Sequence, residues 1–223
     1  MVQSVLLKDE TSKQDYLVIS TNKLKDAYVL YTHNRFEGAC YIVGYTLECV
    51  VKYIILREFQ CNKRKDVWNL YKNPESCVRR VYDGLFTGIN DFKISIFGKE
   101  YTKSNIDEFK SMAKTVYCDM LDKHSFEKAL EHISTEKKVK LDLNRYKYAL
   151  DWSEQWRYRM YSDGKHTQHD INNEENCKKL IEEIIDIINQ FYHNEIITPK
   201  EYETYFKKVI ESELKSCLNT SVQ

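Results

Sequence analysis

Glu48 is the first residue of this sequence whose chemistry calls for an explanation, because it lies near the apolar side of a helical pattern. In RFEGACYIVGYTLECVVK, residues 35–52, it stands between Leu47 and Val51. A carboxylate held partly out of water needs hydrogen-bond donors, and one is rarely enough. Lys52 lies one helical turn further on and can supply the first of them. The sequence therefore predicts that a second segment of the chain brings another donor to Glu48.

An arginine-rich segment, DWSEQWRYR over residues 151–159, is the best source of that donor. Trp152 and Trp156 are four residues apart and would share one face of a helix. The guanidinium of Arg157 presents a planar pair of N–H groups that fits both oxygens of a carboxylate. We therefore expect an ion pair between Glu48 and Arg157 that joins two distant parts of the chain.

Metal-binding and nucleotide-binding patterns give no competing site. His166, His169 and Asp170 lack a further ligand at a spacing that zinc sites use. The sequence has no P-loop, no G-x-G-x-x-G and no nucleophile elbow. We therefore expect no metal and no cofactor. Four other histidines have no recognisable partners and are expected to be solvated: His33, His124, His132 and His193.

The cysteines and the apolar runs bear on location. The seven cysteines contain no CxxC pair, and an odd number without a pattern is typical of reduced cytosolic thiols. Cys40 and Cys49 are expected to pack as small hydrophobic residues. No signal-peptide core of sufficient length is recognisable at the N-terminus, and we expect no run that approaches the roughly 18 apolar residues of a membrane span. We therefore expect a cytoplasmic protein without a membrane partner.

The charge balance limits how the chain could bind nucleic acid. It has 34 basic and 34 acidic residues, so its formal net charge is zero. Proteins that bind nucleic acid generally show a basic excess. Any contact with RNA must therefore come from a local patch of positive charge.

The helix that carries Glu48 is the most strongly patterned element, and we expect it over about 36–59. Apolar residues recur every three or four positions along it, in a stripe broad enough for a central helix. Gly38 and Gly44 each cost a helix about 1 kcal/mol relative to alanine. We expect both glycines to let a neighbouring helix approach closely.

Further helical patterns predict the rest of the bundle. They cover about 23–33, 105–133, 141–160, 173–193 and 199–217. Ser20, Thr21 and Asn22 could cap the first of these helices, and residues 16–19 form either a short strand or its lead-in. Asn172 with Glu175 resembles a capping box, and Thr198-Pro199-Lys200-Glu201 is a fuller start signal.

Residues 61–104 are less regular. The basic cluster CNKRK, residues 61–65, is expected to be a solvated loop, and Phe92, Ile94 and Ile96 before Phe97-Gly98-Lys99 favour a short hairpin. Only two prolines and six glycines occur in the chain, which favours long helices. Together these patterns predict one all-α domain over 1–223, an up-and-down bundle of five to six helices. It carries an irregular insertion at 61–104 and an extra C-terminal helix at 199–217.

The segment RFEGACYIVGYTLECVVKYII resembles the second helix of HEPN-domain proteins, where R-Y-x-G-A-x-Y-L-x-G-Y-x-x-E-x-x-L-K is common. This chain matches that pattern at Arg35, Gly38, Ala39, Tyr41, Gly44, Tyr45, Glu48 and Lys52. It departs mildly at Phe36, Ile42 and Val51. The W-x-x-x-x-R-Y pattern of one HEPN branch matches Trp152, Arg157 and Tyr158. The resemblance covers the helices near 22–60 and 141–193 and leaves 61–104 and the last helix unexplained.

HEPN domains are helical bundles that often form dimers, and many are metal-independent ribonucleases of toxin–antitoxin, phage-defence and CRISPR-linked systems. The resemblance implies a homodimer that binds RNA or a nucleotide, with an antitoxin or defence-system protein as partner. The catalytic motif of HEPN ribonucleases, carried over to this chain, implies that Arg159 stabilises the charge on a phosphate and that His166 moves a proton. The implied supporting residues are Glu48, Arg157, Tyr158 and Lys165.

The chain departs from the HEPN motif in two respects, so alternatives stay open. Six residues separate Arg159 from His166, and Met160 stands where the family prefers Asn, Asp or His. Asp163-Gly164 also places a turn between the two groups. The second hypothesis is a non-catalytic HEPN module that binds a nucleotide, an RNA or a protein. A third is a helical adaptor in which Glu48 belongs to an ordinary buried ion pair.

Overall fold

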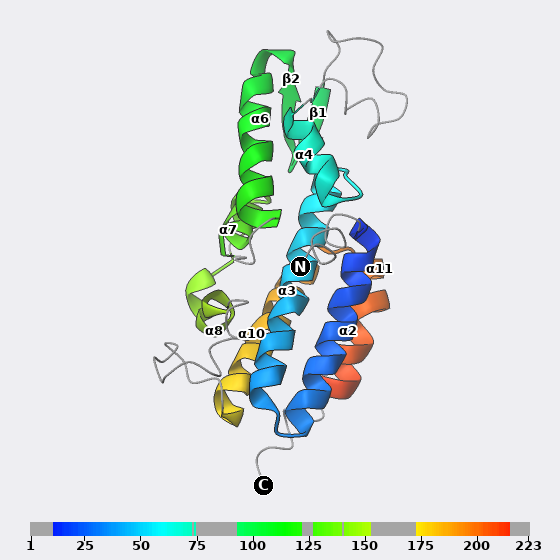
Figure 1. The fold of residues 1–223 in the computed structure, drawn as a ribbon, viewed down its shortest axis with the longest axis vertical. Helices are drawn as coiled ribbons and strands as arrows, with labels where there is room; N and C mark the ends of the chain where they lie inside the picture. The colour runs from blue at the N-terminus through cyan, green and yellow to red at the C-terminus, as the bar shows by residue number, and fades with distance from the viewer. Residues whose placement is uncertain are drawn as a thin grey trace, which may run out of the picture.

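The computed structural model describes residues 11–72, 74, 93–121, 127–139, 141–152 and 173–214 of the chain. Over these residues the protein is an elongated, mostly helical bundle with one short β-hairpin (Figure 1). One end holds α2 (Lys13–Thr32), α3 (Phe36–Glu58), α10 (Glu174–His193) and α11 (Pro199–Tyr202). The other holds α4 (Arg64–Lys72), β1 (Lys93–Ile96), β2 (Lys99–Thr102) and α6 (Ile106–Thr115). The expected all-α fold class is confirmed.

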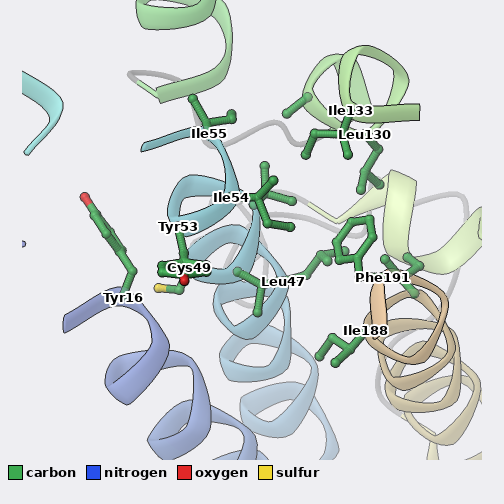
Figure 2. Close-up of a cluster of buried hydrophobic side chains, with 14 of the residues drawn as sticks. Tyr16, Leu47, Cys49, Tyr53, Ile54, Ile55, Leu130, Ile133, Ile188 and Phe191 are labelled. Carbon is green, nitrogen blue, oxygen red and sulfur yellow. The ribbon is translucent and has the colours of Figure 1, made fainter. Parts of the chain in front are cut away.

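α3 is the central helix, as the sequence predicts. It packs against α2 on one side and α10 on the other. Figure 2 shows Leu47 and Ile54 of α3 directed toward Phe191 of α10, while Tyr53 of α3 lies on the side of Tyr16 of α2. α7 (Glu127–Glu136) adds Leu130 and Ile133 above the same cluster. The broad apolar stripe thus buries α3 on most sides, and the core runs along it.

α3 is also long and apolar enough to cross a membrane, judged by length and composition alone. An 18-residue window of it has a mean hydropathy of 1.6, which corrects the expectation that no run approaches this length. Within the bundle, 83% of that window is buried. The core helix of a soluble protein passes the same test, so the composition of α3 is weak evidence for a membrane span.

α2 begins earlier than the sequence predicts. Ser12 is its N-cap: the Ser12 hydroxyl accepts from the Asp15 N–H at 3.3 Å, and the Asp15 carboxylate accepts from the Ser12 N–H at 3.0 Å. The expected cap at Ser20, Thr21 and Asn22 is wrong, because Ser20 lies inside the helix and its hydroxyl donates to a carbonyl one turn earlier. Residues 16–19 are helical, not a strand.

The insertion at 61–104 is more ordered than expected where the structure describes it. The cluster at residues 61–65 is not only a loop, because Arg64 begins α4 and is 3% exposed. The predicted hairpin is confirmed: β1 and β2 pair antiparallel, with Ile96 opposite Lys99. Gly98 lies in its turn at a φ of +81°, where glycine is favoured. Residues 73 and 75–92 lie outside the described part.

The single helix expected over 105–133 is in fact two. α6 continues as a π-helical segment, η3 (Val116–Leu121), and α7 begins at Glu127. The apolar spacing extends across both helices, and a pattern of this kind does not reveal where a chain changes direction. Residues 122–126, between the two helices, lie outside the described part.

The C-terminal helices start close to where the sequence predicts. α10 is capped by Asn173, whose side chain accepts from the Asn176 N–H at 2.8 Å, so the expected box at Asn172 is wrong by one residue. The capping box of Thr198 and Glu201 is confirmed at the start of α11. α11 continues through two π-helical segments, η5 (Glu203–Lys207) and η6 (Val209–Leu214), which pack on α2. Residues 215–217 of the expected helix lie outside the described part.

Glu201 ties α11 to the central helix. Its carboxylate accepts a hydrogen bond from the Tyr53 hydroxyl, and an Arg57 N–H donates to it at 3.2 Å. Arg57 also donates to the Ile196 carbonyl at 2.6 Å. Burial and the bond to Glu201 raise the pKa of Tyr53, so the phenol keeps its proton and remains a donor. One carboxylate thus serves both as a helix cap and as an anchor.

Glu201→Gln is expected to destabilise the protein by about 1.5–3 kcal/mol, because the amide cannot match charge-assisted bonds to Arg57 and Tyr53. The free energy of unfolding, from urea titration followed by circular dichroism, measures this. Glu203→Gln is the matched control, since Glu203 pairs only at 3.6 Å with Lys207 on an exposed surface. Equal losses for the two variants would contradict the anchoring role of Glu201.

Candidate functional site

Glu48 and Lys52 form a buried ion pair on α3. The Lys52 ammonium donates to Glu48, and the two residues are 5% and 6% exposed, respectively. The first donor expected for Glu48 is therefore confirmed. Taking two charges out of water is costly even when they pair, and removing one partner leaves the other charge buried without compensation.

The thiols beside this pair are inert. Burial, aided by the Glu48 carboxylate, raises the pKa of Cys49 to about 12. Cys40 is fully buried, and its hydrogen bond with Cys177 together with burial raises its pKa as well. A thiol that stays protonated is a poor nucleophile. Cys40 and Cys49 are packing residues, as expected.

Trp152 packs directly on Gly44, one helical turn before Glu48. A Cβ atom built on Gly44 would lie 2.0 Å from Cε2 of the indole, so only glycine fits there. The Trp152 ring also meets the Tyr45 ring edge-on, with centroids 5.1 Å apart. The group that fills the space at Gly44 is thus an aromatic side chain, carried by the residue that ends α8 (Lys147–Asp151). Among the described residues, the nearest group to a Cβ atom at Gly38 is the Leu30 side chain, at 3.4 Å.

Trp152 stands where the chain leaves a short helix. α8 (Lys147–Asp151) ends at Trp152, whose ψ of 137° is extended. The helix expected over 141–160 is therefore wrong in its first half: a 3-10 turn, η4 (Leu143–Arg145), precedes α8 and the helix stops at Asp151. Trp152 is also the last described residue before residue 173.

α10 holds α8 in place through three polar side chains. The Glu183 carboxylate accepts from the Ala149 N–H at 2.8 Å, which caps the first turn of α8. Burial raises the pKa of Glu183, although backbone hydrogen bonds from Ala149, Tyr148 and Lys147 act to lower it. Tyr146 donates to Asp186 at 2.8 Å, and Tyr148 donates to Asn176 at 3.0 Å. α10 thereby fixes the start of the arginine-rich segment. We call this stretch, from Trp152 to Arg159, the tryptophan-bracketed segment.

Only part of the predicted site lies within the described residues. Glu48 is described, and so is Trp152, the first residue of the tryptophan-bracketed segment. The remaining predicted site residues lie outside the described part: Arg157, Tyr158, Arg159, Lys165 and His166. The Glu48–Arg157 pair therefore stays a prediction. The structure does bring Trp152, at the start of the segment that contains Arg157, to Gly44 of α3. Gly44 and Glu48 are four residues apart and therefore lie on the same side of that helix.

A second candidate is a cavity of about 270 Å³ between α6, η3 and α7. It is lined by Met112, Met120 and His132 among others. His132 was expected to be solvated, but it is half-buried and its ring meets the Phe97 ring edge-on at 4.9 Å. Burial lowers the pKa of His132, which favours the neutral ring. Its Nε2 has no hydrogen-bond partner among the described residues.

Sequence reasoning missed one surface. A strip of aromatic and basic side chains follows the seam between α4 and the α6–η3 helix. Its signal was present at helical spacing in Arg64, Trp68, Tyr71 and Lys72, within a stretch that the low regularity of 61–104 obscured. Within the described ranges, no group of three or more His, Cys, Asp or Glu side chains could hold a metal ion.

No protein-family model, curated protein or solved structure matches this chain. The class that the fold defines is an all-α bundle built around one central helix. Its distinguishing features are the buried Glu48–Lys52 pair and the indole of Trp152 packed on Gly44 of the same helix.

Proposed function

We propose that the protein is a HEPN-like RNA-binding protein that cuts RNA without a metal ion. The observation that carries the proposal is the contact of Trp152 with Gly44. Both residues belong to the two patterns that resemble HEPN domains, and these patterns are 108 positions apart in the chain (152 minus 44). Their contact supports a bundle in which the later of the two patterns packs against the helix that carries Glu48.

The proposed chemistry follows from the residue types implied by the resemblance. His166 takes the proton of a 2′-hydroxyl, and the 2′-oxygen attacks the neighbouring phosphorus to form a cyclic phosphate. The bond from phosphorus to the 5′-oxygen breaks, and that oxygen takes its proton from water. Arg159 stabilises the negative charge that builds on the phosphate oxygens. Arg157 and Tyr158 support the segment through Glu48, and Lys165 adds positive charge. We propose further that two copies form the cleft in the cytoplasm, with an antitoxin or defence-system protein as partner.

A ribonuclease assay in the presence of a chelator tests this function. The wild type is expected to cut single-stranded RNA with EDTA present, while His166→Ala and Arg159→Ala leave the RNA intact. His193→Ala is the matched control, because His193 lies at the end of α10 and carries no proposed role. Molecular mass in solution, measured in parallel, is expected to be that of a dimer. Equal cleavage by the wild type and His166→Ala, or none by either, would remove the mechanism.

The second candidate is a non-catalytic HEPN module that binds a nucleotide, an RNA or a protein partner. Met160 and the six-residue spacing between Arg159 and His166 favour it, as does the net charge of zero. This candidate predicts RNA binding without cleavage, unaffected by His166→Ala. The same samples used for the cleavage assay therefore separate the two functions.

A further inference from the structure

Three partly exposed aromatic rings lie in a row along the seam between α4 and the α6–η3 helix. Trp68 is central: its ring centroid is 5.2 Å from that of Tyr71 and 4.9 Å from that of Tyr117. The rings are tilted by 58° and 46° to each other, so they do not form one closed stack. All three are of intermediate exposure, which leaves part of each ring at the surface.

Basic side chains alternate with these rings. The Lys72 ammonium lies 4.8 Å from the Trp68 centroid and 5.0 Å from the Tyr71 centroid, and Lys114 lies 5.9 Å from the Tyr71 centroid. Both lysines are exposed. We call the five residues Trp68, Tyr71, Lys72, Lys114 and Tyr117 the aromatic–basic strip. Cation–π contacts at exposed sites are weak and rearrange easily, so the ammonium groups can exchange a ring for an anion.

The charge of this surface is positive although the protein is neutral. Residues 63–72 contain three surface lysines, the buried Arg64 and one acidic residue. The acidic residue, Asp66, accepts hydrogen bonds from the backbone N–H groups of Asn62 and Lys63, at 3.1 and 2.8 Å. On the other side of the seam, Asp119 is 3.7 Å from Lys128. The strip is thus the kind of local basic patch that a neutral protein needs in order to bind a polyanion.

We propose that the aromatic–basic strip binds single-stranded nucleic acid. Bases stack on the exposed parts of the rings of Trp68, Tyr71 and Tyr117, and phosphates contact Lys72 and Lys114. A surface that alternates rings and cations matches a single strand, which offers a base and a phosphate at each step. A duplex hides the base faces and would leave the rings unused. The site lies between α4 of the insertion and the α6–η3 helix, not in the proposed cleft, and does not depend on catalysis.

Fluorescence anisotropy with labelled oligonucleotides of about 12 residues tests the strip, because sites of about 4–16 nucleotides are usual for such surfaces. The probes are oligo(U) RNA, oligo(dT) DNA and an RNA duplex, and all proteins carry His166→Ala so that cleavage does not interfere. Lys72→Gln/Lys114→Gln is expected to weaken binding of the single strands about tenfold or more. It is also expected to reduce the slope of log K against log salt by about 1.4, for two lost phosphate contacts.

The matched control is Lys179→Gln/Lys207→Gln, which removes the same charge from exposed positions on α10 and η5. Its affinity is expected to equal that of the parent. Trp68→Leu keeps an apolar side chain without a ring and is expected to weaken binding about 5- to 100-fold with little change in salt slope. Circular dichroism checks that each variant is folded, and the lysine pair remains decisive if Trp68→Leu is not.

Both single strands are expected to bind, because stacking tolerates both sugars, and the ratio of the two affinities shows whether RNA is preferred. Equal affinity of the strip and control variants would overturn it. So would tighter binding of the duplex, or no binding of any oligonucleotide. If the strip instead binds an acidic peptide such as oligo(Glu), and no oligonucleotide, its partner is a protein and the proposal is wrong. These binding measurements do not depend on cleavage. If the protein fails to cut RNA, the proposal for the strip is still tested by them.

Discussion

Gly44→Ala is expected to destabilise the protein by about 3 kcal/mol, whereas Gly38→Ala is expected to stabilise it by up to about 1 kcal/mol. The added methyl at position 44 would lie 2.0 Å from the indole of Trp152, which is rigid and 3% exposed. At position 38 the methyl meets the flexible end of Leu30 at 3.4 Å. Both changes favour the helix equally, so the difference between them reports the contact with Trp152. Urea unfolding followed by circular dichroism measures both.

Trp152→Ala in the Gly44→Ala background separates a clash from a general defect. Trp152→Ala alone removes a buried aromatic side chain and is expected to cost about 3–5 kcal/mol. In the double variant the methyl no longer meets the indole, so the total loss is expected to fall short of the sum by about 1–3 kcal/mol. Losses that add, or equal effects of Gly44→Ala and Gly38→Ala, would show that the indole does not occupy this position.

The central helix was predictable because its pattern is local. Apolar residues at every third or fourth position identify α3 within one residue of its ends. α2 was harder, since its capping residue Ser12 lies in a polar stretch that precedes the strongest part of its apolar pattern. Ser20, Thr21 and Asn22 looked like a cap for the same reason. A capping residue can be recognised only when the start of the helix is already known.

The candidate site was predictable only where its partners are close in sequence. Glu48 and Lys52 are four residues apart, and their pairing follows from helix geometry. The first turn of α8 depends on Glu183, which is 34 positions from the Ala149 N–H that it caps, and no local sequence pattern predicts such a contact. Gly44 and Trp152 were both conspicuous in the sequence. That the two touch could be learned only from the fold.

The aromatic–basic strip shows the opposite case, in which a local signal was present and overlooked. Trp68 and Tyr71 follow Arg64 at helical spacing, but the surrounding segment lacked the regularity that marks a buried helix. α4 is short and only one face of it is buried, so its pattern is brief. Tyr117 lies 49 positions after Trp68 (117 minus 68), and it joins the row only because η3 packs on α4.

Lys52→Met is expected to lower the free energy of unfolding by about 3–5 kcal/mol, because it leaves the Glu48 carboxylate buried without its ammonium partner. Replacing both members of a buried pair with apolar residues of similar volume is often neutral. If Glu48 is also held by Arg157, as we propose, Glu48→Leu/Lys52→Met leaves the guanidinium without its carboxylate. The double variant is then expected to stay well below the wild type in urea unfolding.

Adding Arg157→Met to that double variant is expected to restore most of the lost stability, because no charge of the proposed cluster remains unpaired. Glu175→Leu/Lys179→Met provides the control: this pair has the same spacing on α10 but is exposed, and it is expected to leave stability unchanged. Recovery in the triple variant would connect the tryptophan-bracketed segment to α3 energetically. A double variant as stable as the wild type would instead mean that Glu48 needs no donor beyond Lys52. That result would favour the hypothesis of a helical adaptor over the proposed ribonuclease, because the contact proposed to support the segment with Arg159 would be absent.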